Sequence, residues 1–273
     1  MKEEVTMINY RSYFAFGREP FAQDIKTEDL YTTPSLHAIA DRLSYTINIK
    51  AVCVITGEVG AGKSTTLRYA QSKLHPSLYK VIPLIASTGS ALEILRGICI
   101  ALDVENHCSS IVRLMKIIRD CLMESSQRKQ TPVLIIDEAH LMRLDVFALL
   151  HTIGQFEMDS MPVMPMILSG QNNLIDKLMY HTSRPLASRV VGRGHLEGLR
   201  LKEMTGYIAH HLEIAGVKEQ LFSEEAILAI HQGSGGLLRR ANILARGALI
   251  AAAAEKLNVV SGEHVRIAST EVI

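Results

Sequence analysis

The stretch Gly57-Glu-Val-Gly-Ala-Gly-Lys-Ser64 follows an apolar, β-branched run at residues 51–56 and opens a segment with helical character. It fits the pattern G-x-x-x-x-G-K-[ST], and its place between a strand and a helix is the one that phosphate binding requires. Glycines let such a loop wrap closely, so that backbone N–H groups point at phosphate oxygens. The following helix adds its positive dipole end. The stretch therefore predicts a phosphate loop after a buried parallel strand.

The side chains at the end of this loop predict nucleotide binding with a metal ion. Lys63 is expected to reach the β- and γ-phosphates of ATP, and the Ser64 hydroxyl is expected to bind Mg²⁺. The candidate nucleotide-binding residues of the loop are Gly57, Glu58, Val59, Gly60, Ala61, Gly62, Lys63, Ser64 and Thr65.

A second signal is the pair Asp137-Glu138, which ends the apolar run 132–136. Carboxylates at the end of a buried strand can face a phosphate loop on a neighbouring strand. Asp137 is expected to hold Mg²⁺ through water, and Glu138 to orient and deprotonate the attacking water. A pair of acids favoured by a helix N-terminus is the alternative interpretation. The run Asp-Glu-Ala-His140 also resembles a helicase signature, but helicases need two RecA-like domains and this chain has room for one.

Polar residues follow a further predicted strand at Ser169 and Gln171. Either side chain is a candidate for holding the attacking water or sensing the γ-phosphate, and the sequence leaves the choice between them open. Both residue types are also ordinary turn formers.

Arginines supply the last catalytic candidates. Arg189 precedes the last predicted strand, where a subunit can present a guanidinium to a neighbour's γ-phosphate; Arg184 is the alternative. Arg239 follows a glycine-rich turn in the C-terminal part and is expected to reach the nucleotide when that part closes. Arg240 beside it is an alternative or a surface charge.

Strands and helices alternate along the first two thirds of the chain, which predicts an α/β fold with a parallel sheet covered on both faces. The segment 81–86 contains Pro83 and is therefore expected to be an edge strand or an irregular segment. The other expected strands are 51–56, 132–136, 163–168 and 190–199, and the main helices between them are 90–102, 109–128 and 144–156. Helical patterns at 202–215, 223–232, 237–257 and 261–270 follow. The expected domains are an N-terminal arm (1–35), an ATPase domain (36–199) and a helical lid (200–273).

Composition excludes several protein classes. Hydrophobic residues make up 48% and charged residues 21% of the 273 residues, as in ordinary globular proteins rather than disordered or fibrous ones. A net charge of +1 excludes nucleic-acid binding that is driven by the charge of the whole molecule, but a local basic face remains an alternative. The four cysteines match neither a metal pair nor a disulfide framework. Since neither a secretory signal nor a membrane span is visible, we expect a cytoplasmic protein.

Nearly the whole chain resembles the AAA+ ATPases. The features that carry this resemblance are the phosphate loop, the Asp-Glu strand, the polar strand end, the arginine before the last strand and the lid with its glycines and arginine. Further segments resemble the ExeA-type ATPases. They are Tyr13-Phe-Ala-Phe-Gly17, Pro20-Phe21, Leu30-Tyr31, His37, Gly57-Glu-Val-Gly60, Leu168-Ser-Gly-Gln171, Tyr207-Ile-Ala-His210, Ala215-Gly216, Phe222 and Ser234-Gly-Gly with Arg239 and Asn242. This family's usual prolines before the lid arginine and after Gly-Gln are Leu238 and Asn172 here.

The resemblance implies a P-loop ATPase with one of two roles. Short family members are similar to the MuB, TnsC and IstB regulators of transposition, which oligomerise on DNA with ATP and activate a transposase. This implies double-stranded DNA, a transposase and further copies of the chain, in a ring or filament, as partners. Long members are secretion-pathway ATPases that remodel an envelope protein complex. A third alternative is a binding module that uses ATP mainly as an assembly switch.

A DNA-contacting surface is not evident from the sequence. Arg113, Lys116 and Arg119 share helical spacing and are candidates for following a phosphate backbone. Such charges are more often the solvated face of an amphipathic helix.

Overall fold

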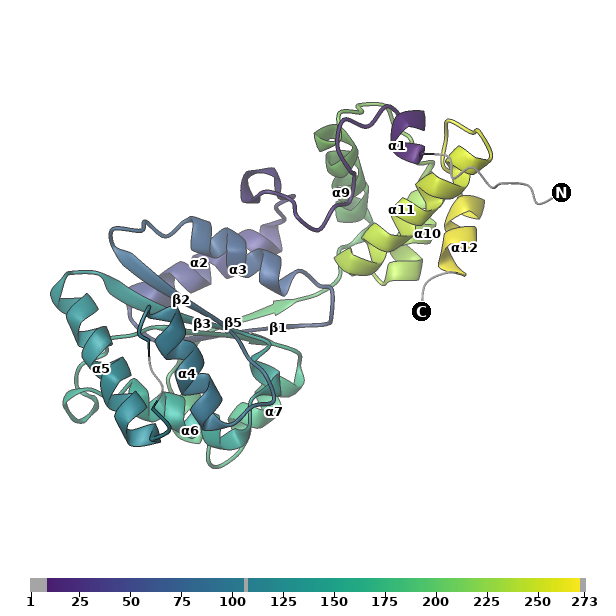
Figure 1. Cartoon of the computed structure of the whole chain (residues 1–273). Helices are drawn as coiled ribbons and strands as arrows, with labels where there is room; N and C mark the ends of the chain where they lie inside the picture. The colour runs from purple at the N-terminus through teal and green to yellow at the C-terminus, as the bar shows by residue number, and fades with distance from the viewer. Residues whose placement is uncertain (1–8, 106–107, 271–273) are drawn as a thin grey trace. The chain divides into compact units, whose positions relative to one another are not determined.

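The computed structural model describes residues 9–105 and 108–270, which divide into two units (Figure 1). One is an α/β unit made of residues 34–58 and 63–196, and the other is a helical unit made of residues 9–33, 59–62 and 197–270. Of the expected arm and lid, residues 1–8 and 271–273 lie outside the described residues.

The α/β unit is built on a five-stranded sheet in which every pair is parallel. Its strand order is β2-β3-β4-β1-β5. The strands are β1 (Val52–Gly57), β2 (Tyr79–Ile85), β3 (Thr131–Asp137), β4 (Met166–Gly170) and β5 (Val190–Leu196). The predicted edge position of the strand that contains Pro83 is confirmed, because β2 pairs only with β3 among the described residues.

The bounds of every strand differ from those expected by at least one residue, and two strands differ most. The strand predicted at 163–168 runs from Met166 to Gly170, since Pro165 has no N–H to donate to a ladder. The strand predicted at 190–199 ends at Leu196, where the chain enters the helical unit. The shift of β4 places Ser169 inside the strand rather than beyond it.

Helices cover both faces of the sheet, as predicted. Figure 1 shows α2 and α3 on one face and α4, α5, α6 and α7 on the other. Their bounds are α2 (Pro34–Asn48), α3 (Lys63–Ser72), α4 (Ala91–Ala101), α5 (Ile111–Gln127), α6 (Leu144–Ile153) and α7 (Asn173–Met179), followed by the short α8 (Arg184–Ala187). β1, β3 and β4 are apolar runs because side chains on both of their faces are buried.

The helical unit contains the four helices predicted for the C-terminal part. They are α9 (Leu201–Ile214), α10 (Glu224–Ser234), α11 (Leu238–Ala254) and α12 (Gly262–Ser269). Ser223 begins α10 as its N-cap, accepting a hydrogen bond from the Ala226 N–H at 3.1 Å.

The aromatic N-terminal segment packs into the core of this same helical unit. It contains the short helices α1 (Tyr10–Tyr13) and η1 (Thr27–Asp29). Phe21 is fully buried, with its ring stacked 5.2 Å from the ring of His211. Arg246 of α11 donates a 2.9 Å hydrogen bond to the Phe21 carbonyl. The arm is therefore a structural part of the helical unit.

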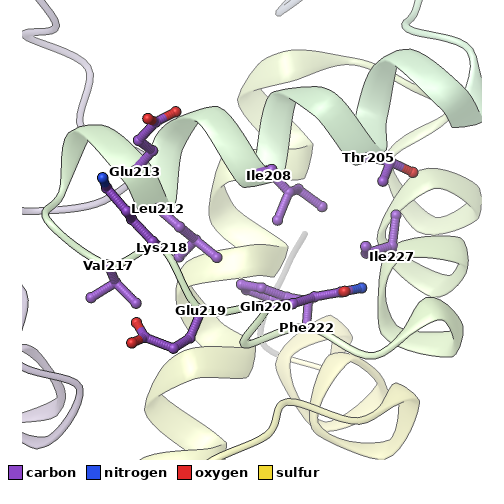
Figure 2. Close-up of a pocket in the computed structure, with 11 residues that line it drawn as sticks. Thr205, Ile208, Leu212, Glu213, Val217, Lys218, Glu219, Gln220, Phe222 and Ile227 are labelled. Carbon is purple, nitrogen blue, oxygen red and sulfur yellow. The ribbon is translucent and has the colours of Figure 1, made fainter.

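A hollow of about 410 Å³ lies in the helical unit between α9 and the chain that leads to α10 (Figure 2). Ile208, Leu212 and Phe222 form its apolar floor, while Glu213 and Lys218 lie at its rim. Within residues 9–105 and 108–270, no helix is long and apolar enough to span a bilayer.

Candidate functional site

The phosphate loop leaves the sheet at the carboxyl end of β1 and leads directly into α3. Gly60 and Gly62 have φ angles of +85° and +97°, a region that side-chain-bearing residues rarely adopt. The two glycines thus give the loop its turn, and α3 begins at Lys63 with its N-terminus on the loop. The local structure is the strand–loop–helix arrangement that the motif predicts.

Lys63 is buried at the start of α3, and the residue is 6% exposed. Its Nζ donates to the Gly57 and Glu58 carbonyls, each at 3.0 Å. A buried ammonium needs such acceptors. The two carbonyls hold the charge at the start of the loop, beside the positions where phosphates are expected.

Ser64 and Asp137 meet although their segments are far apart in sequence. The Ser64 hydroxyl donates to Asp137 Oδ2 at 2.7 Å, and Asp137 Oδ1 accepts from the Glu138 N–H at 2.9 Å. The expectation that the Asp-Glu strand neighbours the strand of the loop is wrong: β4 lies between β1 and β3. The two ends meet nonetheless, because carboxyl ends of parallel strands lie along one edge of the sheet.

This pair of oxygen ligands fits Mg²⁺, which prefers oxygens and keeps several of its waters. One hydroxyl and one carboxylate 2.7 Å apart leave most of the coordination sphere to water and phosphate. Thr65, the next residue of α3, is half-buried.

Glu138 stands at the end of β3 in a left-handed conformation, with φ 55° and ψ 28°. Its side chain is 39% exposed, and its Oε2 lies 3.3 Å from Nδ1 of the buried His140. This contact is not a hydrogen bond, and Nδ1 has no hydrogen-bond partner among the described residues. The sequence contained His140 in its Asp-Glu-Ala-His run, but without indicating that the ring packs against the proposed base.

The end of β4 lies between the two motifs. Ser169 is fully buried, is paired in register with Ile55 of β1, and its Oγ has no hydrogen-bond partner among the described residues. Gln171 follows the strand and is half-buried. Asn172 donates from Nδ2 to Glu58 Oε1 at 3.3 Å, and so ties the loop to this strand end. In the sequence, Asn172 stands out only because the ExeA-type family usually has a proline at this position.

Arg189 lies at the amino ends of the strands, opposite to the carboxyl ends where the phosphate loop begins. Its carbonyl accepts from the Val52 N–H at 3.1 Å, at the amino end of β1. The loop starts at the other end of this six-residue strand, about 20 Å away at the usual rise per residue. Arg189 is half-buried, with Nη1 beside Gly154, whereas Arg184 on α8 is exposed. Neither arginine belongs to the cluster around Lys63.

Arg239 is the second residue of α11. Its backbone N–H lies 3.3 Å from the Gly60 carbonyl, and its side chain is exposed, as is that of Arg240. Residues 59–62 belong to the same unit as α11. Leu238, in the place of the family's usual proline, still begins the helix.

The candidate basic face on α5 is smaller than its spacing indicates. Arg113 and Lys116 are exposed. Arg119 instead donates to the Thr152 carbonyl at 3.3 Å and lies 4.5 Å from the centre of the Phe156 ring. Only the first two are therefore available to a phosphate backbone without breaking contacts.

Comparison with protein families assigns the segment that contains these motifs. Residues 48–178 match the family model described as AAA domain. They form an AAA domain. The matched segment includes the phosphate loop, Asp137 and Glu138, and the end of β4. The predicted P-loop fold is confirmed, and the match to the AAA domain spans just under half of the chain.

Individual proteins resemble the chain over most of its length. It is 26% identical over 265 residues to General secretion pathway protein A of Aeromonas hydrophila. The aligned region covers 96% of this chain and 48% of the relative. The chain thus spans about half the length of this curated relative. The match agrees with the ExeA-type resemblance of the sequence.

Solved structures share the fold at low identity. Cdc6p from Pyrobaculum aerophilum superposes with a TM-score of 0.71 at 15% identity, covering 93% of this chain and 70% of that one. The ORC1 protein of Aeropyrum pernix in complex with DNA gives 0.67 at 15% identity, covering 92% and 68%. At this identity the likeness shows the fold alone.

Proposed function

We propose that the protein is an ATP-dependent, DNA-binding AAA+ ATPase that oligomerises on double-stranded DNA and recruits or activates a transposase. The observation that carries the ATPase part is the 2.7 Å contact between Ser64 and Asp137, with Glu138 next in sequence and Lys63 buried beside them. These four residues supply the groups needed to bind and hydrolyse a nucleoside triphosphate.

In the proposed reaction the loop N–H groups and Lys63 hold the β- and γ-phosphates. Glu138 accepts a proton from a water whose oxygen attacks the γ-phosphorus, and the bond from that phosphorus to the bridging oxygen of ADP breaks. Ser169 or Gln171 orients this water from the end of β4. Mg²⁺ held by Ser64 and Asp137 would neutralise charge on the phosphates.

The nucleotide site is proposed to be shared between subunits. Arg189 lies at the edge of the sheet opposite its own phosphate loop, about 20 Å away at the usual rise of a strand. A side chain placed there serves a neighbour's γ-phosphate rather than its own, as arginine fingers supplied in trans do. Arg184, which is exposed, is the alternative finger. Arg239 is proposed to contact the nucleotide of its own subunit. A head-to-tail contact of this kind generates a ring or a filament.

The DNA and transposase parts rest on the resemblance to ExeA-type ATPases, on Arg113 and Lys116 as exposed cations, and on the fold shared with a DNA-bound ORC1. Fold-level likeness is analogy rather than a site argument. Cytoplasmic location and the absence of a membrane partner belong to the same proposal.

A second candidate is a secretion-pathway ATPase that remodels an envelope protein complex. The observation in its favour is the 26% identity to General secretion pathway protein A. It predicts a partner in the membrane and ATP turnover that is indifferent to DNA.

Two measurements separate the candidates. The first is ATP turnover with and without double-stranded DNA, and the second is co-sedimentation of the protein with DNA in the presence of a poorly hydrolysed ATP analogue. Analogue-dependent co-sedimentation at moderate salt, with altered turnover, supports the transposition role. Turnover that ignores DNA, without co-sedimentation, supports the remodelling role.

A further inference from the structure

We propose that His140 is a positioning residue that holds the carboxylate of Glu138 and connects it to the end of β4. The inference rests on the proposed ATP hydrolysis and names a residue that the motifs leave without a role. His140 acts through Glu138 and touches neither nucleotide nor water.

The first observation is that the ring is buried while the carboxylate beside it is partly exposed. His140 is 7% exposed and lies on the 3-10 turn η2 (Ala139–Leu141), which is closed by a 2.9 Å hydrogen bond from the Leu141 N–H to the Glu138 carbonyl. The Glu138 side chain is 39% exposed. A ring held by packing can limit where the neighbouring carboxylate rests.

The second observation is that the strand does not orient Glu138. Its left-handed backbone, at φ 55°, turns the residue out of the direction of β3, and residues with a side chain rarely adopt this conformation. Among the described residues, the one polar group in contact with its carboxylate is His140 Nδ1, 3.3 Å from Oε2. Contacts of this kind are often long before substrate binds and tighten in the reacting complex.

The third observation connects the ring to β4. Gly170 lies so close to His140 that an added Cβ would stand 3.0 Å from its backbone nitrogen and 3.2 Å from its Cβ and Nδ1. Gly170 separates Ser169 from Gln171, the two candidates for sensing the γ-phosphate. A shift of this strand end therefore displaces the ring, and with it the support of Glu138.

Replacing His140 by asparagine and by glutamine distinguishes a ring that positions Glu138 from a ring that only fills space in the core. The amide of asparagine occupies the place of Nδ1, which faces Glu138, whereas the longer glutamine places its amide where Nε2 lies. If the ring only fills space, both changes act through stability alone. If Nδ1 positions the base, His140→Asn retains turnover and His140→Gln loses it.

The test measures kcat, the affinity for a fluorescent ATP analogue, and the Tm of wild type, Glu138→Gln, His140→Ala, His140→Asn, His140→Gln and Gly170→Ala. We expect kcat to fall about 10- to 100-fold in His140→Ala, His140→Gln and Gly170→Ala, as small misplacements of catalytic groups do. Nucleotide affinity should stay within about twofold, and His140→Asn within about threefold of wild-type kcat.

The proposal is overturned if His140→Ala keeps wild-type kcat, or if His140→Asn and His140→Gln lose turnover equally with the same drop in Tm. Those results leave the ATPase proposal standing, provided that wild type hydrolyses ATP and Glu138→Gln does not. A wild-type protein that neither binds nor hydrolyses ATP overturns both.

Discussion

The Ser64 hydroxyl, on the first turn of α3, donates a 2.7 Å hydrogen bond to the Asp137 carboxylate at the end of β3. The strands that precede these residues, β1 and β3, are not neighbours, since β4 lies between them. The contact therefore gathers the phosphate loop, the acidic pair and the end of β4 at one edge of the sheet.

Replacing Lys63 by alanine should abolish nucleotide binding. The change removes the ammonium that Gly57 and Glu58 carbonyls hold and that phosphates are expected to attract. We expect a loss of about 100-fold or more in ATP affinity, measured by titration with a fluorescent analogue. Lys73→Ala, at an exposed position in the chain after α3, serves as the control. Near-normal affinity in Lys63→Ala would contradict the assignment of the loop.

Glu138→Gln should separate binding from hydrolysis. Because glutamine cannot accept the proton of the attacking water, we expect turnover to fall about 100-fold or more while ATP binding persists. Radioactive phosphate release measures the first and analogue titration the second. If ATP is mainly an assembly switch, this variant leaves DNA binding and transposase activation nearly intact; if hydrolysis drives release, it gives trapped, ATP-loaded assemblies.

Arg189→Ala should lower turnover without preventing nucleotide binding, since the finger acts on a neighbour's γ-phosphate. Mixing Arg189→Ala with Lys63→Ala in equal amounts should then restore about a quarter of the sites, as one intact loop meets one intact finger. Arg184→Ala tests the alternative finger, and Arg193→Ala, at an exposed arginine of β5, is the control. A fully active Arg189→Ala monomer would exclude the shared site.

Phe21→Ala should destabilise the helical unit, because its fully buried ring stacks on His211. Removing a buried phenylalanine ring costs about 3–5 kcal/mol. Urea unfolding followed by circular dichroism measures the loss, with Tyr45→Ala at an exposed position of α2 as the control. A loss below about 1 kcal/mol would show that the arm is not part of this core.

His211 predicts a loss of stability in acid. Burial lowers its pKa from 6.5 to about 3, so the folded protein keeps the ring neutral while the unfolded chain binds a proton below pH 6.5. Stability from this group is complete above pH 6.5 and falls as the pH drops towards 3. The slope is about 1.4 kcal/mol per pH unit, or about 2 kcal/mol between pH 7 and pH 5.

The free energy of unfolding of wild type and His211→Gln at pH 7 and pH 5 tests this prediction. The variant lacks the titrating ring, so its difference between the two pH values should be smaller by about 2 kcal/mol. Equal pH dependence in both proteins would show that His211 is protonated as readily in the fold as outside it.

Much of this architecture follows from the sequence. Apolar, β-branched runs before Gly57 and Asp137 predict buried parallel strands, and Pro83 predicts the sheet edge, because these features depend on local chemistry. The side chains next to the site were less predictable. The contacts of Asn172 with Glu58 and of His140 with Glu138 depend on how strand ends and turns pack, which no spacing in the sequence states.

The contacts of Arg119 were also not predictable from the sequence. Its helical spacing with Arg113 and Lys116 predicts one basic stripe, yet it packs on Phe156 and bonds the Thr152 carbonyl. Helical periodicity gives the face of a residue, but not the neighbours that another helix brings to it.

The most direct test of ATP-switched DNA binding is retention of Glu138→Gln on double-stranded DNA at moderate salt, in ATP, in ADP and without nucleotide. We expect strong retention in ATP only, and loss of this retention when Lys63→Ala is added to the same chain. Retention that is equal in all three conditions, or absent from all of them, would contradict ATP-switched DNA binding.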